Sequence, residues 1–171
     1  LVTGVQTCAL PISVLFIVTH RDLLIEMDCF FAPNSVAVVG ASRDDTKVGH
    51  GVLKNMVEAG FEGNLFPVNP KADEILGLKC FKSITDLPEA PDLVVLTIPS
   101  PFVLNAVEDM GKKGSHAAVI ITAGFKETGI EGAKLEAELM ARASELDIRI
   151  IGPNCLGIIN THHHVNASFA A

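Results

Sequence analysis

The sequence predicts an α/β fold, a Rossmann-like parallel sheet of about five strands with helices on both faces. Apolar runs alternate with helix-like segments from Ser35 onward, which is the pattern of parallel βαβ units. Each apolar run is followed by small, polar or turn-forming residues. The chain has 171 residues, 49% of them hydrophobic, which suits one domain with one buried core.

The first strand is predicted at residues 35–39, where a continuous apolar run is typical of a strand buried on both faces. A helix is expected from about residue 49 to residue 59, because apolar residues recur there at helical spacing. Gly60 ends this helix. Residues 64–68 form the second predicted strand.

The segment from Asn69 to Pro91 is longer than an ordinary loop. Within it, residues 83–88 predict a short helical turn that ends at the proline. The remaining elements are expected as a strand at 92–98, a helix from about 101 to 113, a strand at 117–122, a helix over roughly 132–145 and a fifth strand at 149–151.

The composition excludes several classes of function. A net charge of −7 without a cluster of basic residues disfavours nucleic acid as a partner. The four cysteines show no CxxC spacing, so reduced thiols in a cytoplasm are expected and neither a zinc site nor a disulfide framework is predicted. The apolar run at residues 14–18 is too short to span a membrane.

The predicted strands all end in turns that suit ligand binding. In an open parallel sheet, ligands bind at the carboxyl ends of the strands, so these turns should lie along one edge and form one site. The candidate binding residues in these turns are Gly40, Ala41, Ser42, Lys47, Gly49, Asn69, Pro70, Lys71, Pro99, Ser100, Pro101, Phe102, Thr122, Ala123, Gly124 and Asn154.

The first two turns indicate a phosphorylated ligand. Gly40 opens an expanded loop in place of a GxGxxG turn, and the helix that begins near Gly49 offers free N–H groups to a phosphate. Lys71 stands at the end of the second strand, where an NAD site has a carboxylate. A lysine there fits NADP or the 3′-phosphorylated ADP of coenzyme A. The alternative for Lys71, and for Arg43 and Lys47, is an exposed loop charge.

Other reactive residues give weaker indications. Three consecutive histidines, His162 to His164, cannot all point the same way from extended backbone, and no acid or cysteine lies at ligand spacing. Cys155 follows Asn154 without a readable base partner, so a small buried thiol is favoured over a nucleophile. We therefore assign no catalytic and no metal-binding residue.

The strand-end motifs together resemble a known family. Phe30–Ser42, Pro67–Lys71, Ile98–Pro101, Ile121–Phe125 and Gly152–Gly157 are similar to the N-terminal CoA-binding domain of NDP-forming acyl-CoA synthetases, the ADP-forming acetate–CoA ligases related to succinyl-CoA synthetase. The resemblance covers residues 27–171 and implies coenzyme A as the ligand.

The resemblance also implies roles for the candidate residues. The first turn and Lys71 would hold the CoA nucleotide, residues 99–102 and 122–124 would line the course of the pantetheine arm, and Asn154 would lie near the thiol. In this family a histidine of the next domain is transiently phosphorylated. A chain without that domain and without the nucleotide-grasp domain or subunit is expected to bind CoA without turnover. The alternatives are a CoA-sensing regulatory domain of a protein acetyltransferase and an NADP-binding oxidoreductase domain.

The chain is expected to divide into three segments. Residues 1–13 resemble a translated sequencing adapter, so residues 1–26 are predicted to be a non-native or disordered extension before a native start at Met27. Residues 27–160 form the CoA-binding Rossmann-like domain. Residues 161–171 are expected to begin the linker to a missing next domain, which makes the three histidines a native loop.

Overall fold

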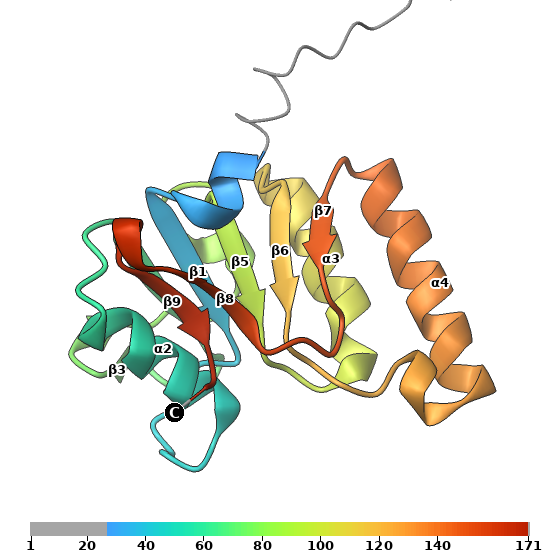
Figure 1. Ribbon diagram of the computed structural model, residues 1–171, viewed down its shortest axis with the longest axis horizontal. Coiled ribbons are helices and arrows are strands. Elements are labelled where there is room, and N and C mark those ends of the chain that lie inside the picture. Colours follow the sequence, from blue (N-terminus) through green and yellow to red (C-terminus); the bar gives the residue numbers. More distant parts are fainter. Residues whose placement is uncertain (1–26, 171) are drawn as a thin grey trace, which may run out of the picture.

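The computed structural model describes residues 27–170, and the predicted extension at residues 1–26 lies outside the described residues. A five-stranded parallel sheet forms its centre, which confirms the predicted fold class (Figure 1). The strands lie in the order β2 (Asn64–Val68), β1 (Ser35–Val39), β5 (Leu93–Leu96), β6 (Ala117–Ile120) and β7 (Arg149–Ile151).

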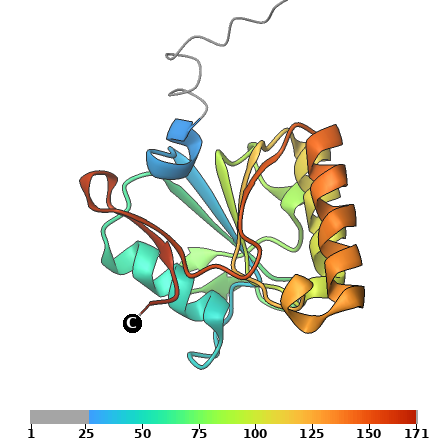
Figure 2. The same ribbon diagram turned by 45° about the vertical axis from the view of Figure 1, so that its right-hand side comes forward.

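Each face of the sheet is covered by different elements. Side chains alternate along β1, so that Val36 and Val38 belong to one core cluster and Ala37 and Val39 to the other. Figure 2 shows the two layers on opposite sides of the sheet. The first layer contains helix α2 (Val48–Glu58), and the second contains helices α3 (Val103–Lys113) and α4 (Ile130–Glu145).

A hairpin near the end of the chain completes the α2 layer. Strands β8 (Gly157–Asn160) and β9 (Val165–Ser168) pair antiparallel, and the amide of Asn55 in α2 donates to the carbonyl of Ser168 at 2.9 Å. Val165 and Ala167 are fully buried in the same core as α2. The boundary predicted after residue 160 therefore falls inside this hairpin, and the packed unit continues through Ser168.

A second hairpin occupies the long segment after β2. Strands β3 (Glu74–Ile75) and β4 (Leu78–Lys79) are joined by Leu76 and Gly77, whose φ angles are 50° and 75°. Two consecutive positive φ angles are typical of a type I′ turn, which usually contains Asn-Gly. Because leucine occupies the first position, the sequence does not predict this turn.

The predicted elements are otherwise present with small shifts. Helix α2 and strand β2 lie within one residue of the predicted ranges, and the expected turn at residues 83–88 contains the short 3₁₀ helix at Ile84–Asp86. The helix expected from residue 101 begins as a 3₁₀ turn, Ser100–Phe102, before α3. Strands β5 and β6 end two residues earlier than predicted, although the N–H groups of Thr97 and Ile121 still donate to Val39 and Leu96 of the neighbouring strands.

The first turn of α2 packs directly on the end of β1. A Cβ atom at Gly49 would lie 2.0 Å from the carbonyl oxygen of Gly40, a distance that no side chain can accept. Gly40 itself has φ of +90°, and a Cβ there would lie 2.8 Å from the hydroxyl of Thr97. That hydroxyl donates to the carbonyl of Val39 at 2.8 Å. The two glycines thus fix where the helix begins relative to the strand.

Replacing Gly49 with alanine should lower the free energy of unfolding by about 1–3 kcal/mol, because the new methyl group overpacks the backbone of Gly40. Gly51→Ala is the matched control in the same helix, since a Cβ there meets nothing within 4 Å. It should raise stability by about 1 kcal/mol through helix propensity. Urea denaturation of both variants measures the difference, and equal effects at the two positions would contradict the packing argument.

Candidate functional site

Two adjoining clefts open at the carboxyl edge of the sheet. The larger, which we call the β2 cleft, has a volume of about 790 Å³ and lies among the turns after β1, β2 and β5. The other, the β6 cleft, has a volume of about 680 Å³ and lies among the turns after β5, β6 and β7. Lys47, Ile98 and Pro99 line both, so the two clefts form one continuous groove.

The β2 cleft combines apolar walls with lysines. Lys47, Lys71 and Lys82 line it, and Asp109 is the one acidic residue among the described lining residues. This concentration of positive charge stands out in a chain with a net charge of −7. Its other lining residues are Val39, Gly40, Val68, Asn69, Pro70, Ser83, Ile84, Ile98, Pro99, Phe102, Asn105 and Ala106.

The β6 cleft is mostly apolar. Val48, Leu156 and Phe169 lie at its rim with 42%, 65% and 40% of their surface exposed. Phe169 reaches the cleft because the β8–β9 hairpin returns the chain to this edge of the sheet, where the backbone N–H of Phe169 donates to the carbonyl of Leu156. The remaining lining residues are Lys47, Thr97, Ile98, Pro99, Ile121, Thr122, Ala123, Asn154 and Cys155.

Asn69 holds the turn after β2 against the turn after β1. Its side-chain amide donates to the carbonyl of Ala41 at 2.7 Å, and its side-chain oxygen accepts from the backbone N–H of Lys71 at 2.8 Å. The backbone before Lys71 is therefore fixed, while the lysine side chain is exposed. Within the described residues, no hydrogen bond or ion pair engages its ammonium group, which leaves the charge available to a ligand.

The loop between β1 and α2 is tied together by its own side chains. Ser42 accepts a hydrogen bond from the N–H of Asp44, and its carbonyl lies 2.9 Å from Nδ1 of His50. The carboxylate of Asp44 accepts from both the hydroxyl and the N–H of Thr46, at 2.7 and 3.0 Å. These hydrogen bonds lower the pKa of Asp44, so that the carboxylate stays charged and the loop stays closed.

The turn after β6 is also internally bonded. The N–H groups of Gly124 and Phe125 donate to one oxygen of Glu127, at 2.5 and 3.1 Å, and these bonds lower the pKa of the Glu127 carboxyl. Gly124 has φ of +106°, and a Cβ there would lie 2.5 Å from the hydroxyl of Ser100. Gly124 and Ser100 thus pack against each other and supply no surface to either cleft.

The structure divides the predicted site residues into two groups. The residues that line the groove are Gly40, Lys47, Asn69, Pro70, Lys71, Pro99, Phe102, Thr122, Ala123 and Asn154. The predicted residues that do not line it are Ala41, Ser42, Gly49, Ser100, Pro101 and Gly124. For Ala41 and Gly49 the reason is burial, since both lie in the packed contact between β1 and α2.

Several groove residues were not predicted. Lys82 lies far along the chain from Lys71 and reaches the β2 cleft because Phe81 pairs with Val68. Cys155, predicted as a buried thiol, is half-buried and lines the β6 cleft, where its thiol donates to the carbonyl of Ile120 at 3.4 Å. Lys82 has no local sequence signal, because its position depends on pairing between distant segments, whereas Cys155 directly follows the predicted site residue Asn154.

Metal binding and membrane insertion find no support in the part of the chain that the structure describes. Among residues 27–170, no group of three or more histidine, cysteine, aspartate or glutamate side chains could hold a metal ion. His162 and His163 lie in a short 3₁₀ turn, while Nδ1 of His164 lies 3.0 Å from the carbonyl of Ala59. None of the helices described is both long and apolar enough to cross a bilayer.

Comparison with known proteins agrees with this geometry. A family model described as a CoA binding domain matches residues 34–161. The ADP-forming acetate–CoA ligase of Methanocaldococcus jannaschii is 49% identical over 138 residues, which cover 81% of this chain and 19% of that protein. The alpha subunit of the ADP-forming acetate–CoA ligase II of Pyrococcus furiosus is 46% identical over 143 residues, which cover 84% of this chain and 31% of that subunit.

A solved structure shows the same fold. The dinucleotide-forming acetyl-coenzyme A synthetase 1 of Ca. Korarchaeum cryptofilum, in complex with phosphate and ADP, superposes with a TM-score of 0.82 at 42% identity and covers 85% of this chain and 31% of that one. The present chain thus spans a third or less of the length of these relatives. It belongs to the CoA-binding domain family and matches the N-terminal region of the ADP-forming acetate–CoA ligases.

Proposed function

We propose that this chain binds coenzyme A along the carboxyl edge of its sheet, as the CoA-binding part of an NDP-forming acyl-CoA synthetase. The observation that carries the proposal is the continuous groove that joins a lysine-lined cleft to an apolar one. Coenzyme A is divided in the same way into a charged part and a less polar part. It has three phosphate groups at its nucleotide end and a long pantetheine arm that ends in a thiol.

The β2 cleft takes the 3′-phosphorylated ADP. Its apolar walls, which include Ile84 and Phe102, suit an adenine ring. Helix α2 has no acidic residue in its first turn and no side-chain cap, so the positive end of its dipole faces the pyrophosphate without internal competition. Lys71, at the end of β2, meets the phosphate on the ribose.

The β6 cleft takes the pantetheine arm. The arm passes the shared wall at Pro99 and continues between Thr122 and Ala123 on one side and the rim residues on the other. The backbone N–H of Asn154 donates to the carbonyl of Thr122 at 3.0 Å, which joins the turns after β6 and β7. This contact supports the assignment of Asn154 to the thiol end of the groove.

The intact enzyme, by the same proposal, interconverts acyl-CoA, NDP and phosphate with carboxylate, CoA and NTP. Its remaining parts are a ligase domain with a phosphorylated histidine and a nucleotide-grasp domain or subunit. No histidine among the described residues lines either cleft of the groove. Cys80 and Cys155 form no disulfide with another described residue, which supports a cytoplasmic location.

Calorimetric titration of the chain should show that coenzyme A binds more tightly than dephospho-CoA, NADP or NAD. The expected order follows from the lysines of the β2 cleft and from the apolar β6 cleft, which the nicotinamide nucleotides leave unfilled. Affinity for CoA should fall as salt is added, because the lysines are exposed to solvent and screened by ions. Tighter binding of NAD or NADP than of CoA would overturn the proposal.

Lys71→Ala should weaken CoA binding by roughly 1–3 kcal/mol, because it removes a charge-assisted hydrogen bond to a phosphate. Lys134→Ala is the matched control, since Lys134 lies on α4 and pairs with Glu131 away from the groove. Calorimetry on both variants makes the comparison. A loss of the same size in the Lys134 variant would mean that net charge, and not position, sets the affinity.

The chain alone should not catalyse the ligase reaction. When it is incubated with acetyl-CoA, ADP and phosphate, we expect no release of free thiol above the rate without protein, because the phosphorylated group belongs to another domain. A thiol-detecting dye gives the readout, and a complete ADP-forming ligase is the positive control. Release of one CoA per ATP formed by the chain alone would contradict this division of roles.

A further inference from the structure

Lys82 lies on the same edge of the sheet as the predicted ligand-binding turns, although it follows no predicted strand. The N–H of Phe81 donates to the carbonyl of Pro67, and the N–H of Asn69 donates to the carbonyl of Phe81, both at 2.9 Å. Val68 and Phe81 form a parallel bridge. The chain beside Phe81 therefore acts as a short further strand on the open side of β2, and Lys82 stands at its carboxyl end, where ligands bind.

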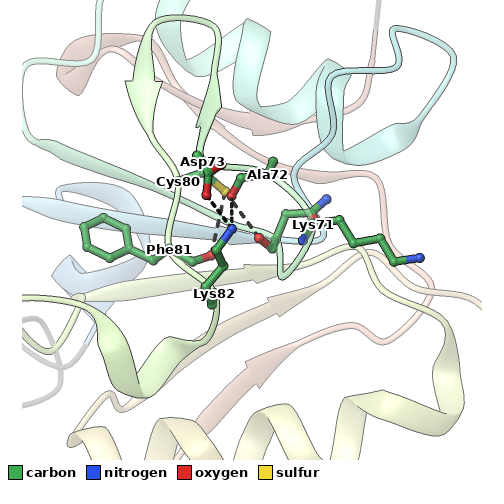
Figure 3. Close-up of polar contacts among 7 residues, drawn as sticks. Lys71, Ala72, Asp73, Cys80, Phe81 and Lys82 are labelled. Atoms are coloured by element: carbon green, nitrogen blue, oxygen red, sulfur yellow. Dashed lines mark hydrogen bonds and ion pairs between the residues drawn. The ribbon is translucent and has the colours of Figure 1, made fainter.

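The ammonium group of Lys82 is held in place by hydrogen bonds that do not use all of its donors. It donates to the carbonyl of Ala72 at 3.0 Å and to the carboxylate of Asp73 at 2.7 Å (Figure 3). An ammonium group has three donors, so a third remains for a ligand. Figure 3 also shows the side chain of Lys71 extended away from these contacts.

The ion pair with Asp73 is an exposed one. The side chains of Lys82 and Asp73 are 49% and 95% exposed, and pairs of this kind are weak. Lys82 and, more weakly, Arg43 lower the pKa of the Asp73 carboxyl, so this single carboxylate stays charged between two cations. A phosphate that carries nearly two negative charges competes with it readily.

The position of Lys82 indicates which phosphate group of the ligand it can reach. In the proposed binding mode, the pyrophosphate lies at the first turn of α2, beside β1. Lys82 lies beyond β2 on the side away from β1, a lateral displacement of two strand spacings, or about 9–10 Å. The end of β2 between them is where dinucleotide folds read the ribose.

We propose that Lys82 is a specificity-determining residue that, together with Lys71, recognises the 3′-phosphate on the ribose of coenzyme A. This inference rests on the proposed function and adds to it the group that distinguishes CoA from dephospho-CoA. Asp73 and the carbonyl of Ala72 orient the ammonium group before the ligand arrives.

The test measures the affinities of CoA and dephospho-CoA for four forms of the chain by calorimetry: the unaltered chain, Lys82→Met, Lys82→Arg and Lys79→Met. Lys82→Met should bind CoA about tenfold more weakly and dephospho-CoA unchanged, which also reports that the cleft is still folded. Lys82→Arg should retain most of the preference for CoA. Lys79→Met is the matched control, since its ammonium lies over the ring of Phe81, 5.2 Å from the centroid, and outside the groove.

Three outcomes would overturn the inference. In the first, Lys82→Met weakens CoA and dephospho-CoA equally, which would assign the lysine to the pyrophosphate or to folding. In the second, Lys82→Met leaves both affinities unchanged. In the third, Lys79→Met or Lys82→Arg loses as much preference for CoA as Lys82→Met. If the unaltered chain fails to bind CoA at all, the proposed function itself is wrong, and this result is distinct from the other three.

Discussion

The close approach of α2 to the end of β1 is the constraint on which the rest of the structure depends. Gly49 lies against the carbonyl of Gly40, with no room for a side chain on either residue. This contact brings the positive end of the helix to the edge of the sheet. Because Lys47 directly precedes that helix and lines both clefts, the same contact also sets the point where the two halves of the groove meet.

In the turns around the groove, several polar groups already form hydrogen bonds within the protein. Asn69 joins the first two turns, Glu127 closes the turn after β6, and Asp44 closes the first loop. Groups that carry these internal bonds are unavailable to a ligand. Recognition is therefore assigned to the cationic donors that remain open, namely the ammonium group of Lys71 and the third donor of Lys82. A chain that is acidic overall can in this way present a local positive surface to a phosphorylated ligand.

The two hairpins extend this edge beyond the βαβ core. The β3–β4 hairpin brings the chain back alongside β2 and positions Lys82 in the β2 cleft. The β8–β9 hairpin packs on α2 and positions Phe169 in the β6 cleft. Each adds a wall to one end of the groove. Their shared feature is a short antiparallel pair, with a turn that contains positive φ angles at Leu76 and Gly77 in the first and at His164 in the second.

The sequence by itself determined the fold class, the order of the main strands and helices along the chain, and the edge of the sheet at which the groove lies. Those features follow from local patterns: continuous apolar runs predicted the buried strands, and helical spacing of apolar residues predicted α2, α3 and α4. The strand-end rule identified Gly40, Lys71 and Asn154 as groove residues, because the carboxyl ends of parallel strands share one edge.

Only the tertiary structure decided which side chains in those turns face the groove and which distant residues join them. Ala41 lies in a predicted turn, yet its side chain is buried in the core, and Gly49 serves the contact with β1. Lys82 joins the site through the pairing of Phe81 with Val68, and Phe169 through a hairpin with no regular apolar period. Such positions depend on contacts between segments far apart in the chain, and local residue patterns carry no information about those contacts.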